Sequence, residues 1–396
     1  MNTRNTQPSV SRRGFLATST AIATFSATGI FPLHNLGAAG HPVLRVVADT
    51  KIDAMVAKAV EYLAKTQSPD GAFSPQSGVG VTALVTTGLL RNGRSPDDPL
   101  VARSLKFLES SVQPDGGIYS PKLGFKNYET CIALTCFVEA NADKRYEKII
   151  RGAEKYLKAN QWTEAVNEND PTKKIDKSHP FYGGAGYGRN KRPDLSNTAF
   201  LVDALKEAGN GPDDESMKKA LVFVSRCQNL ESEYNTTPVA AKNPDGGFYY
   251  TPADGGESAA EKLPNGGLRS YASMTYSGLK SMIYCGVKAD DPRFKAAKKW
   301  IQENYDLKTN PGLGPEGLYY YYHVFAKALA AMGSDTLEDA KGVKHNWRQD
   351  LVAELAARQQ ANGSWANAKS RWLEGDPNLV TGYVLLALSY CRPEAK

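Results

Sequence analysis

The sequence predicts an all-α protein folded as an (α/α)6 barrel, a closed toroid of six outer and inner helix pairs. Two observations lead to this prediction. Charged amphipathic segments alternate with nearly uncharged ones, and a Pro-Asp-Gly turn or a relaxed version of it recurs between them, at residues 67–73, 113–119, 243–249 and 360–365. A closed ring covers the uncharged helix of each pair on all sides, whereas an open solenoid would leave one of its faces in water.

The first 39 residues resemble a twin-arginine export signal. Arg12 and Arg13 precede Phe15 and a modestly apolar run over residues 17–31, and the small residues at 37–39 suit a cleavage site. We therefore expect an exported protein, periplasmic or extracellular, although an uncleaved membrane anchor is the alternative. No other run approaches the roughly 18 apolar residues of a spanning helix, so we expect no transmembrane segment in the mature chain.

The first helix pair shows the alternation. Between residues 51 and 67, apolar side chains such as Ile52, Met55 and Leu63 follow helical spacing and leave the charged residues on the other face. Residues 79–90 carry no charge at all, which is typical of a helix that is buried on nearly every side. The pair therefore predicts one outer and one inner helix.

The turn between the two helices contains residues that end a helix. Proline presets φ, aspartate bonds its own backbone, and glycine accepts a positive φ that would strain another residue by roughly 1 kcal/mol. We expect this conformation at Gly71, Gly116 and Gly246.

The same alternation continues to the C-terminus, so residues 50–392 are predicted to form a single toroid domain. A long polar insertion separates the two helices of the third pair. The outer helices are expected at 51–67, 99–112, 145–160, 214–228, 292–305 and 346–360, and the inner helices at 79–90, 127–141, 196–208, 271–284, 317–332 and 378–390.

Charge and cysteine content exclude some classes of partner. The formal net charge of the 396-residue chain is +6, and the leader arginines contribute three of these charges. A remainder of +3 is too small to indicate binding to nucleic acid. The five cysteines are odd in number and include no Cys-x-x-Cys pair, so buried free thiols are expected rather than disulfides or a metal site.

The turn at Gln67 has the form Gln-x-x-Asp-Gly-x-aromatic, and the turns at Gln113 and, relaxed, Gln360 are similar to it. With the helical alternation, they resemble the repeats of the squalene cyclase and protein prenyltransferase superfamily over residues 50–391. The resemblance implies the α/α toroid fold.

The chemistry of that superfamily is only partly matched. Cyclases carry Asp-x-Asp-Asp-Thr-Ala, and the most similar stretch here, at residues 194–199, has Ser196 where the resemblance places the proton donor. A hydroxyl cannot protonate an alkene. Prenyltransferases hold zinc with Asp-x-Cys and a distant histidine, whereas residues 269–275 contain neither ligand and His323 alone cannot hold the ion. We therefore expect no metal and no cofactor.

Residues at the starts of the inner helices are the candidates for the toroid interior. Their abundance of tyrosine indicates an aromatic cavity that suits a polyprenyl chain or the face of a sugar. The candidate ligand-binding residues are Tyr128, Tyr182, Tyr187, Asn197, Arg269, Tyr271, Tyr320, His323 and Tyr383, and the candidate catalytic residues are Glu129, Asp194 and Asp376.

Each candidate also has a structural alternative. Asp194 and Asp376 could cap helices, Glu129 could be paired in the core, and the tyrosines and His323 could serve packing.

Three functions remain open at this point. The protein could bind or act on an apolar or isoprenoid ligand, it could be a glycan-active hydrolase or lyase, or it could be a non-catalytic interaction protein. A glycan-active enzyme needs paired carboxylates about 5 to 10 Å apart in an open cleft, for which Glu129 with Asp194 or Asp376 are the candidates. A closed aromatic cavity would favour the apolar or isoprenoid ligand, and a toroid whose interior is filled by its own side chains would favour the interaction protein. The sequence gives no basis for an oligomeric state.

Overall fold

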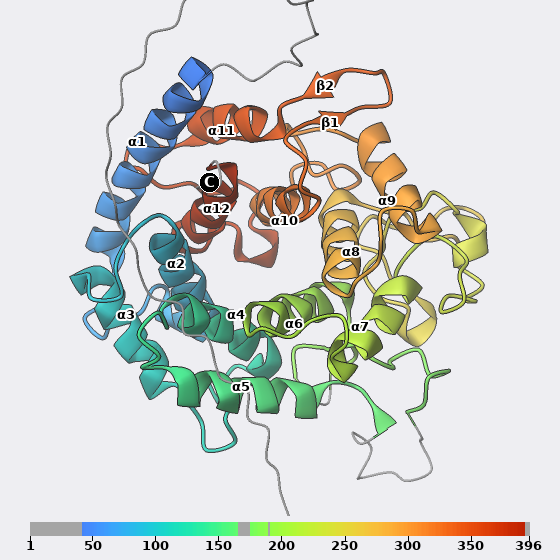
Figure 1. The fold of residues 1–396 in the computed structure, drawn as a ribbon, viewed down its shortest axis with the longest axis horizontal. Helices are drawn as coiled ribbons and strands as arrows, with labels where there is room; N and C mark the ends of the chain where they lie inside the picture. The colour runs from blue at the N-terminus through green and yellow to red at the C-terminus, as the bar shows by residue number, and fades with distance from the viewer. Residues whose placement is uncertain (1–41, 165–174, 189–190, 393–396) are drawn as a thin grey trace, which may run out of the picture. The chain divides into compact units, whose positions relative to one another are not determined.

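A computed structural model describes residues 42–164, 175–188 and 191–392. In the unit that begins at Pro42, twelve helices form an inner ring within an outer ring (Figure 1). The predicted leader, residues 1–39, lies outside the described residues, so the export signal stays a prediction.

The helices alternate between the two rings as predicted. The outer helices are α1 (Pro42–Thr66), α3 (Pro99–Ser110), α5 (Glu147–Asn160), α7 (Glu215–Arg226), α9 (Pro292–Glu303) and α11 (Trp347–Arg358). The inner helices are α2 (Val79–Arg91), α4 (Lys126–Glu139), α6 (Leu195–Glu207), α8 (Ala272–Tyr284), α10 (Leu318–Ala331) and α12 (Pro377–Cys391). The all-α toroid is confirmed, with boundaries within about two residues of those expected except at the start of α1.

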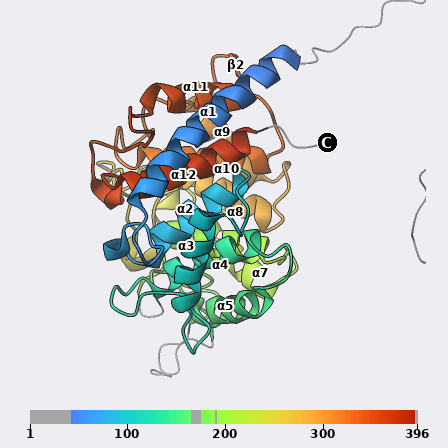
Figure 2. The same ribbon diagram turned by 90° about the vertical axis from the view of Figure 1, so that its left-hand side faces the viewer.

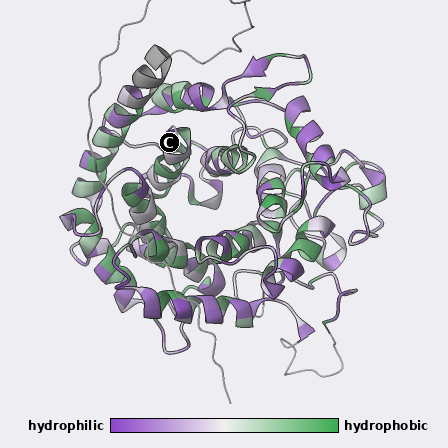
Figure 3. Ribbon diagram, in the orientation of Figure 1, coloured by the Kyte–Doolittle hydropathy of each residue, from purple (hydrophilic) through white to green (hydrophobic). Residues whose placement is uncertain are grey.

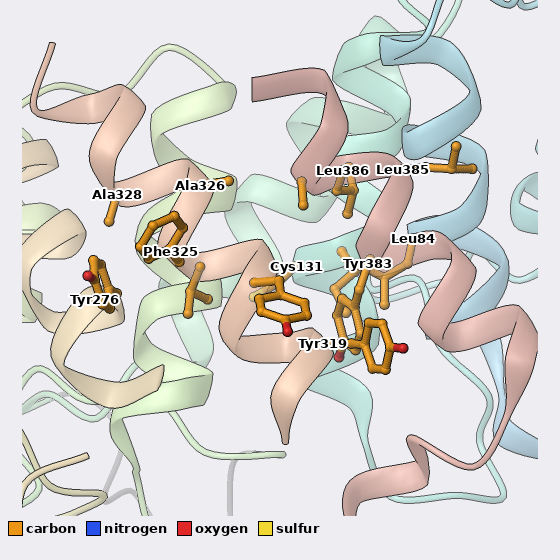
Figure 4. Close-up of a cluster of buried hydrophobic side chains, with 14 of the residues drawn as sticks. Leu84, Cys131, Tyr276, Tyr319, Phe325, Ala326, Ala328, Tyr383, Leu385 and Leu386 are labelled. Carbon is orange, nitrogen blue, oxygen red and sulfur yellow. The ribbon is translucent and has the colours of Figure 1, made fainter. Parts of the chain in front are cut away.

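The inner ring closes because α12 contacts both α10 and α2, and the outer ring closes where α11 contacts α1. Figure 2 shows α1 running beside α12. Hydrophilic residues lie mainly on the outer helices (Figure 3). Figure 4 shows part of the core, where Tyr276 of α8 packs on Phe325 of α10 with ring centroids 5.1 Å apart.

The turn glycines fit against the next outer helix. Gly71, Gly116 and Gly246 have φ values of 92°, 87° and 79°, which confirms the expected conformation. A Cβ atom on Gly71 would lie 2.2 Å from the carbonyl oxygen of Arg103 in α3, and one on Gly363 would lie 2.3 Å from that of Lys58 in α1. The turn that follows the last outer helix therefore packs directly against the first outer helix.

Glutamine side chains also connect these turns to the next outer helix by hydrogen bonds. Nε2 of Gln67 donates to the carbonyl of Gly71 in its own turn and to that of Leu100 in α3, at 3.1 and 2.9 Å. Gln161 and Gln228 make equivalent bonds. In the last turn Gln359 performs this role and not Gln360, because Gln359 is the residue directed at α1. The second turn also differs, since Nε2 of Gln113 donates to the carbonyls of Ser111 and Tyr119 and not to the next outer helix.

A layer of buried charges joins the C-terminal halves of the inner helices. Asp203 of α6 accepts from Nζ of Lys280 in α8 at 2.6 Å and lies 3.1 Å from Nζ of Lys327 in α10. Arg91 of α2 binds Glu139, Glu207 and the hydroxyl of Tyr390 in α12. Buried charges require such pairing, and the contact of Lys327 with Glu207 extends the network through the half-buried Arg91 to the exposed Glu139, so that it reaches all six inner helices.

A short hairpin was not predicted. Strands β1 (Leu337–Glu338) and β2 (Lys344–His345) pair antiparallel between α10 and α11, with Leu337 opposite His345.

All five cysteines are buried free thiols, as expected. Across the described part of the chain, no helix combines the length and hydrophobicity that crossing a membrane requires.

Candidate functional site

A cavity of about 520 Å³ lies at the N-terminal ends of the inner helices, and all six of them contribute to its wall. We call it the central cavity. It lies at the opposite end of the inner helices from the buried charges, because they occupy the C-terminal halves. The site is thus formed by the first turns of the inner helices and the loops before them.

Aromatic side chains dominate the wall. The rings contact one another around the cavity: Phe200 lies 5.1 Å from Tyr128 and 6.1 Å from Tyr320, measured between centroids, and Tyr320 lies 5.8 Å from Tyr383. The aromatic lining residues are Phe125, Tyr128, Tyr187, Phe200, Tyr250, Tyr271, Tyr320, Trp372 and Tyr383. Such a wall offers a large apolar area with hydroxyl groups at fixed points.

The tyrosine hydroxyls of the wall are neutral, and that of Tyr320 is hydrogen-bonded. Oη of Tyr320 lies 3.1 Å from Oγ of Ser196 and 3.4 Å from Oγ of Ser277. Burial raises the pKa of Tyr320 to about 12, and it also raises the pKa of Tyr128, which interacts with Tyr383. These phenols therefore stay protonated near neutral pH and can orient a polar atom of a ligand.

Asp194 does not line the cavity itself but interacts with a tyrosine that does. It is the N-cap of α6, where it accepts from the backbone N–H and the side-chain amide of Asn197 at 2.8 and 2.7 Å. Its carboxyl group also interacts with the side chain of Tyr250, which lines the cavity and interacts with Tyr187. Burial raises the pKa of Asp194 to about 6, so its carboxyl group can take up a proton near neutral pH.

Carboxylates occupy the ends of the inner helices that face this cavity. Glu129 accepts from the backbone N–H of Val79 at the start of α2 at 2.7 Å. Glu374 accepts from that of Tyr320 in α10 at 2.8 Å, and Asp376 caps α12. Each helix N-terminus carries a partial positive charge. At α2, α6, α10 and α12 the chain's own carboxylates already neutralise it.

The mouth of the cavity combines paired charges with exposed apolar residues. Arg192 pairs with Glu257, and Arg371 binds Glu316 at 2.6 Å while lying over the ring of Trp372. Trp372 and Leu373 are 46% and 55% exposed. Both have a positive φ, of 56° and 65°, which is a strained conformation for these side chains.

Solved structures with a similar fold belong to different functional classes. The type II terpene cyclase MstE from Scytonema matches 86% of this chain and 98% of its own, with 14% identity and a TM-score of 0.52. A polysaccharide lyase matches 87% and 97%, with 12% identity and a TM-score of 0.52. A family 88 glycosyl hydrolase from Bacteroides vulgatus matches 86% and 98%, with 11% identity and a TM-score of 0.50.

The chain is an α/α toroid. No protein-family model and no curated protein sequence matches it. At these identities the similarity establishes the fold and leaves the function to the site, since one fold hosts many activities.

The toroid brings five of the nine predicted ligand-binding residues together at the cavity: Tyr128, Tyr187, Tyr271, Tyr320 and Tyr383. The other four lie elsewhere. Tyr182 packs with Ile175 and Val222 in a separate cluster, and Arg269 is exposed in the wall of a neighbouring groove. Asn197 is bonded to Asp194, and His323 is buried, stacked on Tyr383 with centroids 5.9 Å apart.

None of the three predicted catalytic carboxylates is among the residues that line the cavity. Glu129, Asp194 and Asp376 each bind the N-terminus of an inner helix of the toroid, so their catalytic roles stay predictions. Nor do three histidine, cysteine or acidic side chains gather as a metal site anywhere in the described ranges.

Several lining residues lie in loops that sequence reasoning missed. Tyr250 directly follows the turn at residues 243–249, so its place beside an inner helix start was open to inference. The others lie in insertions without helical periodicity: Arg192, Glu257, Arg371, Trp372 and Glu374.

Proposed function

We propose that this toroid binds an apolar, isoprenoid-type ligand in its central cavity. One observation carries the proposal: aromatic side chains line a 520 Å³ cavity while the acidic groups around it are already bound to backbone N–H groups or to arginine. Removing a hydrocarbon chain from water contributes about 25 cal/mol for each Å² buried, and aromatic faces suit unsaturated chains. Burial of apolar surface is thus the main source of affinity.

Standard cyclase chemistry is not part of the proposal. Ser196, at the position where the resemblance places the proton donor, has its hydroxyl 3.1 Å from that of Tyr320. Neither hydroxyl is acidic enough to protonate an alkene. We expect no polycyclic product when the purified protein is incubated with squalene.

A glycan-active enzyme is the second candidate, favoured by the interaction between Tyr250 and the carboxyl group of Asp194. A carboxyl group with a pKa of about 6 behind a cavity phenol could support proton transfer to or from a sugar. The usual pair of free carboxylates facing a sugar is not supplied by Glu129 or Asp376, because each caps a helix.

The test is ligand retention and binding. Native mass spectrometry of the purified protein, with lipid extraction, should reveal a bound hydrocarbon-rich molecule. Farnesol should quench tyrosine and tryptophan fluorescence saturably. Phe200→Ala, in the cavity wall, should weaken farnesol binding roughly tenfold, since a lost aromatic contact costs about 1 to 1.5 kcal/mol.

Phe181→Ala is the matched control, because Phe181 packs against Trp162 and is not part of the cavity wall. Equal affinity of both variants and the unmodified protein for farnesol would refute the proposal. Turnover of a glycan that is lost in Tyr250→Phe would favour the second candidate.

A further inference from the structure

A second recess opens beside the central cavity. It has a volume of about 760 Å³ and lies between the segment that precedes α8 and the segment that follows α9. We call it the side groove. Ala259 and Arg371 line both the groove and the central cavity, so the two recesses share one stretch of wall.

The two recesses have opposite character. The side groove is lined by acidic, basic, amide and hydroxyl groups, among them Asp245, Glu261, Arg269, Ser270, Glu316 and Arg371. Asp245 is fixed by bonds from Oγ of Ser270 at 2.7 Å and from the backbone N–H of Gly247 at 2.9 Å. Three carboxylates against two arginines make the groove unfavourable for a strong anion but rich in both donors and acceptors.

Arg371 is the junction between the recesses. Its guanidinium group lies 4.2 Å from the ring centre of Trp372, which belongs to the central cavity, and binds Glu316, which belongs to the groove. Strained backbone conformations also occur in the walls of both recesses. Of six non-glycine residues with positive φ in the described ranges, Glu261 lies in the groove, and Trp372 and Leu373 in the cavity. Strain of this kind persists where the surrounding structure enforces it, often at ligand sites.

We propose that the ligand is an amphiphile whose apolar chain fills the central cavity and whose uncharged, hydroxyl-rich head group, such as a sugar, lies in the side groove. The inference rests on the proposed function, because it presupposes an apolar chain in the cavity. Sugar hydroxyls both donate and accept, so one head group can bond to Glu261 as a donor and to Arg269 as an acceptor. A phosphate head could accept from the arginines and the amides, but the carboxylates of the wall would repel it.

The experiment compares three probes on the full chain by isothermal titration: farnesol, farnesyl β-glucoside and farnesyl phosphate. The glucoside should bind about tenfold more tightly than farnesol, and the phosphate should bind less tightly than the glucoside. Glu261→Gln combined with Arg269→Ala should abolish the advantage of the glucoside and leave farnesol affinity unchanged. Both side chains are exposed, so the variant should fold.

Glu231→Gln is the control, since Glu231 is exposed and is not part of the groove wall. Equal affinity for glucoside and farnesol, tighter binding of the phosphate, or an unchanged preference in the double variant would overturn the inference and leave the proposed function intact. Failure of farnesol itself to bind would overturn the proposed function, and the inference with it.

Discussion

The side-chain amide of Gln359 at the end of α11 donates to the backbone carbonyl oxygen of Met55 in α1 at 3.0 Å, and to that of Gly363 at 2.9 Å. A single side chain thus joins the last outer helix to the first. Gln359→Leu would leave the carbonyls without this donor, and losing such bonds typically costs about 1 to 3 kcal/mol. We expect a lower melting temperature by calorimetry.

Gln360→Leu is the control for this joint. Gln360 is exposed and its side chain only accepts from the hydroxyl of Ser364. Its substitution should change stability by less than about 0.5 kcal/mol. Equal loss of stability in the two variants would show that Gln359 does not fasten the ring.

The turn glycines can be tested against a glycine of the same backbone conformation. Gly71 and Gly209 have φ values of 92° and 94°, but a Cβ atom on Gly71 would lie 2.2 Å from the carbonyl of Arg103, whereas one on Gly209 would meet nothing within 4 Å. Both alanine variants bear the strain of positive φ, about 1 kcal/mol. Gly71→Ala should lose at least about 2 kcal/mol more in urea unfolding, and equal losses would contradict the close fit of turn and helix.

Asp194 predicts a dependence of stability on pH. Its pKa is raised from 3.8 to about 6 in the folded state because the group is buried. The folded chain therefore binds this proton more tightly than the unfolded chain, and the resulting stability is present below about pH 4 and lost as pH rises through 6.

Asp194→Asn removes this titration and keeps an acceptor for the helix cap. Relative to the unmodified protein, the variant should gain up to about 3 kcal/mol between pH 4 and pH 7. Thermal unfolding at several pH values measures the difference. Two parallel stability curves would show that the carboxyl group does not titrate in this range.

The buried charges predict a large loss from one substitution. Asp203→Asn removes the negative partner of Lys280 and leaves the ammonium groups of Lys280 and Lys327 buried together. Breaking a buried pair costs about 3 to 5 kcal/mol. Asp143→Asn, which removes the exposed partner of Arg145, should leave the free energy of unfolding nearly unchanged in the same assay. Comparable losses would mean that the buried layer adds nothing beyond a surface pair.

The leader gives a prediction for the cell. Replacing Arg12 and Arg13 together by lysine should abolish export of the folded protein, because that pathway reads the arginine pair. Fractionation and immunoblotting follow the fate of the chain. Undiminished export of the double variant would rule out a twin-arginine signal.

The sequence predicted the helices because each one carries its own period, its own turn and a clear difference in charge between the rings. It predicted the cavity tyrosines for a related reason: Tyr128, Tyr271 and Tyr320 lie at or near the starts of inner helices, whose place in a toroid is determined by the repeat. Residues in the insertions have no period, so Arg192 and Arg371 could not be placed in advance.

The carboxylates show the same limit. A residue such as Glu129 near a helix start can point into the cavity or bond to a neighbouring helix end, and the sequence does not distinguish the two. The structure shows the second arrangement, since Glu129 lies on α4 but binds the start of α2, which is remote in sequence. The short hairpin was missed because strands of two residues have no readable alternation.

Closure of the ring has a consequence for the order in which the chain can fold during synthesis. Arg91 of α2 bonds to Tyr390 of α12, so the two partners emerge from the ribosome almost 300 residues apart. Until α12 is made, α2 and α10 each lack the neighbour that covers one apolar side. Contacts so distant in sequence form slowly, and exposed apolar faces recruit chaperones and proteases. Folding of the toroid is therefore completed only once α12 has been made, and a stop codon before Pro377 would yield an open, aggregation-prone arc of helices instead of a smaller toroid.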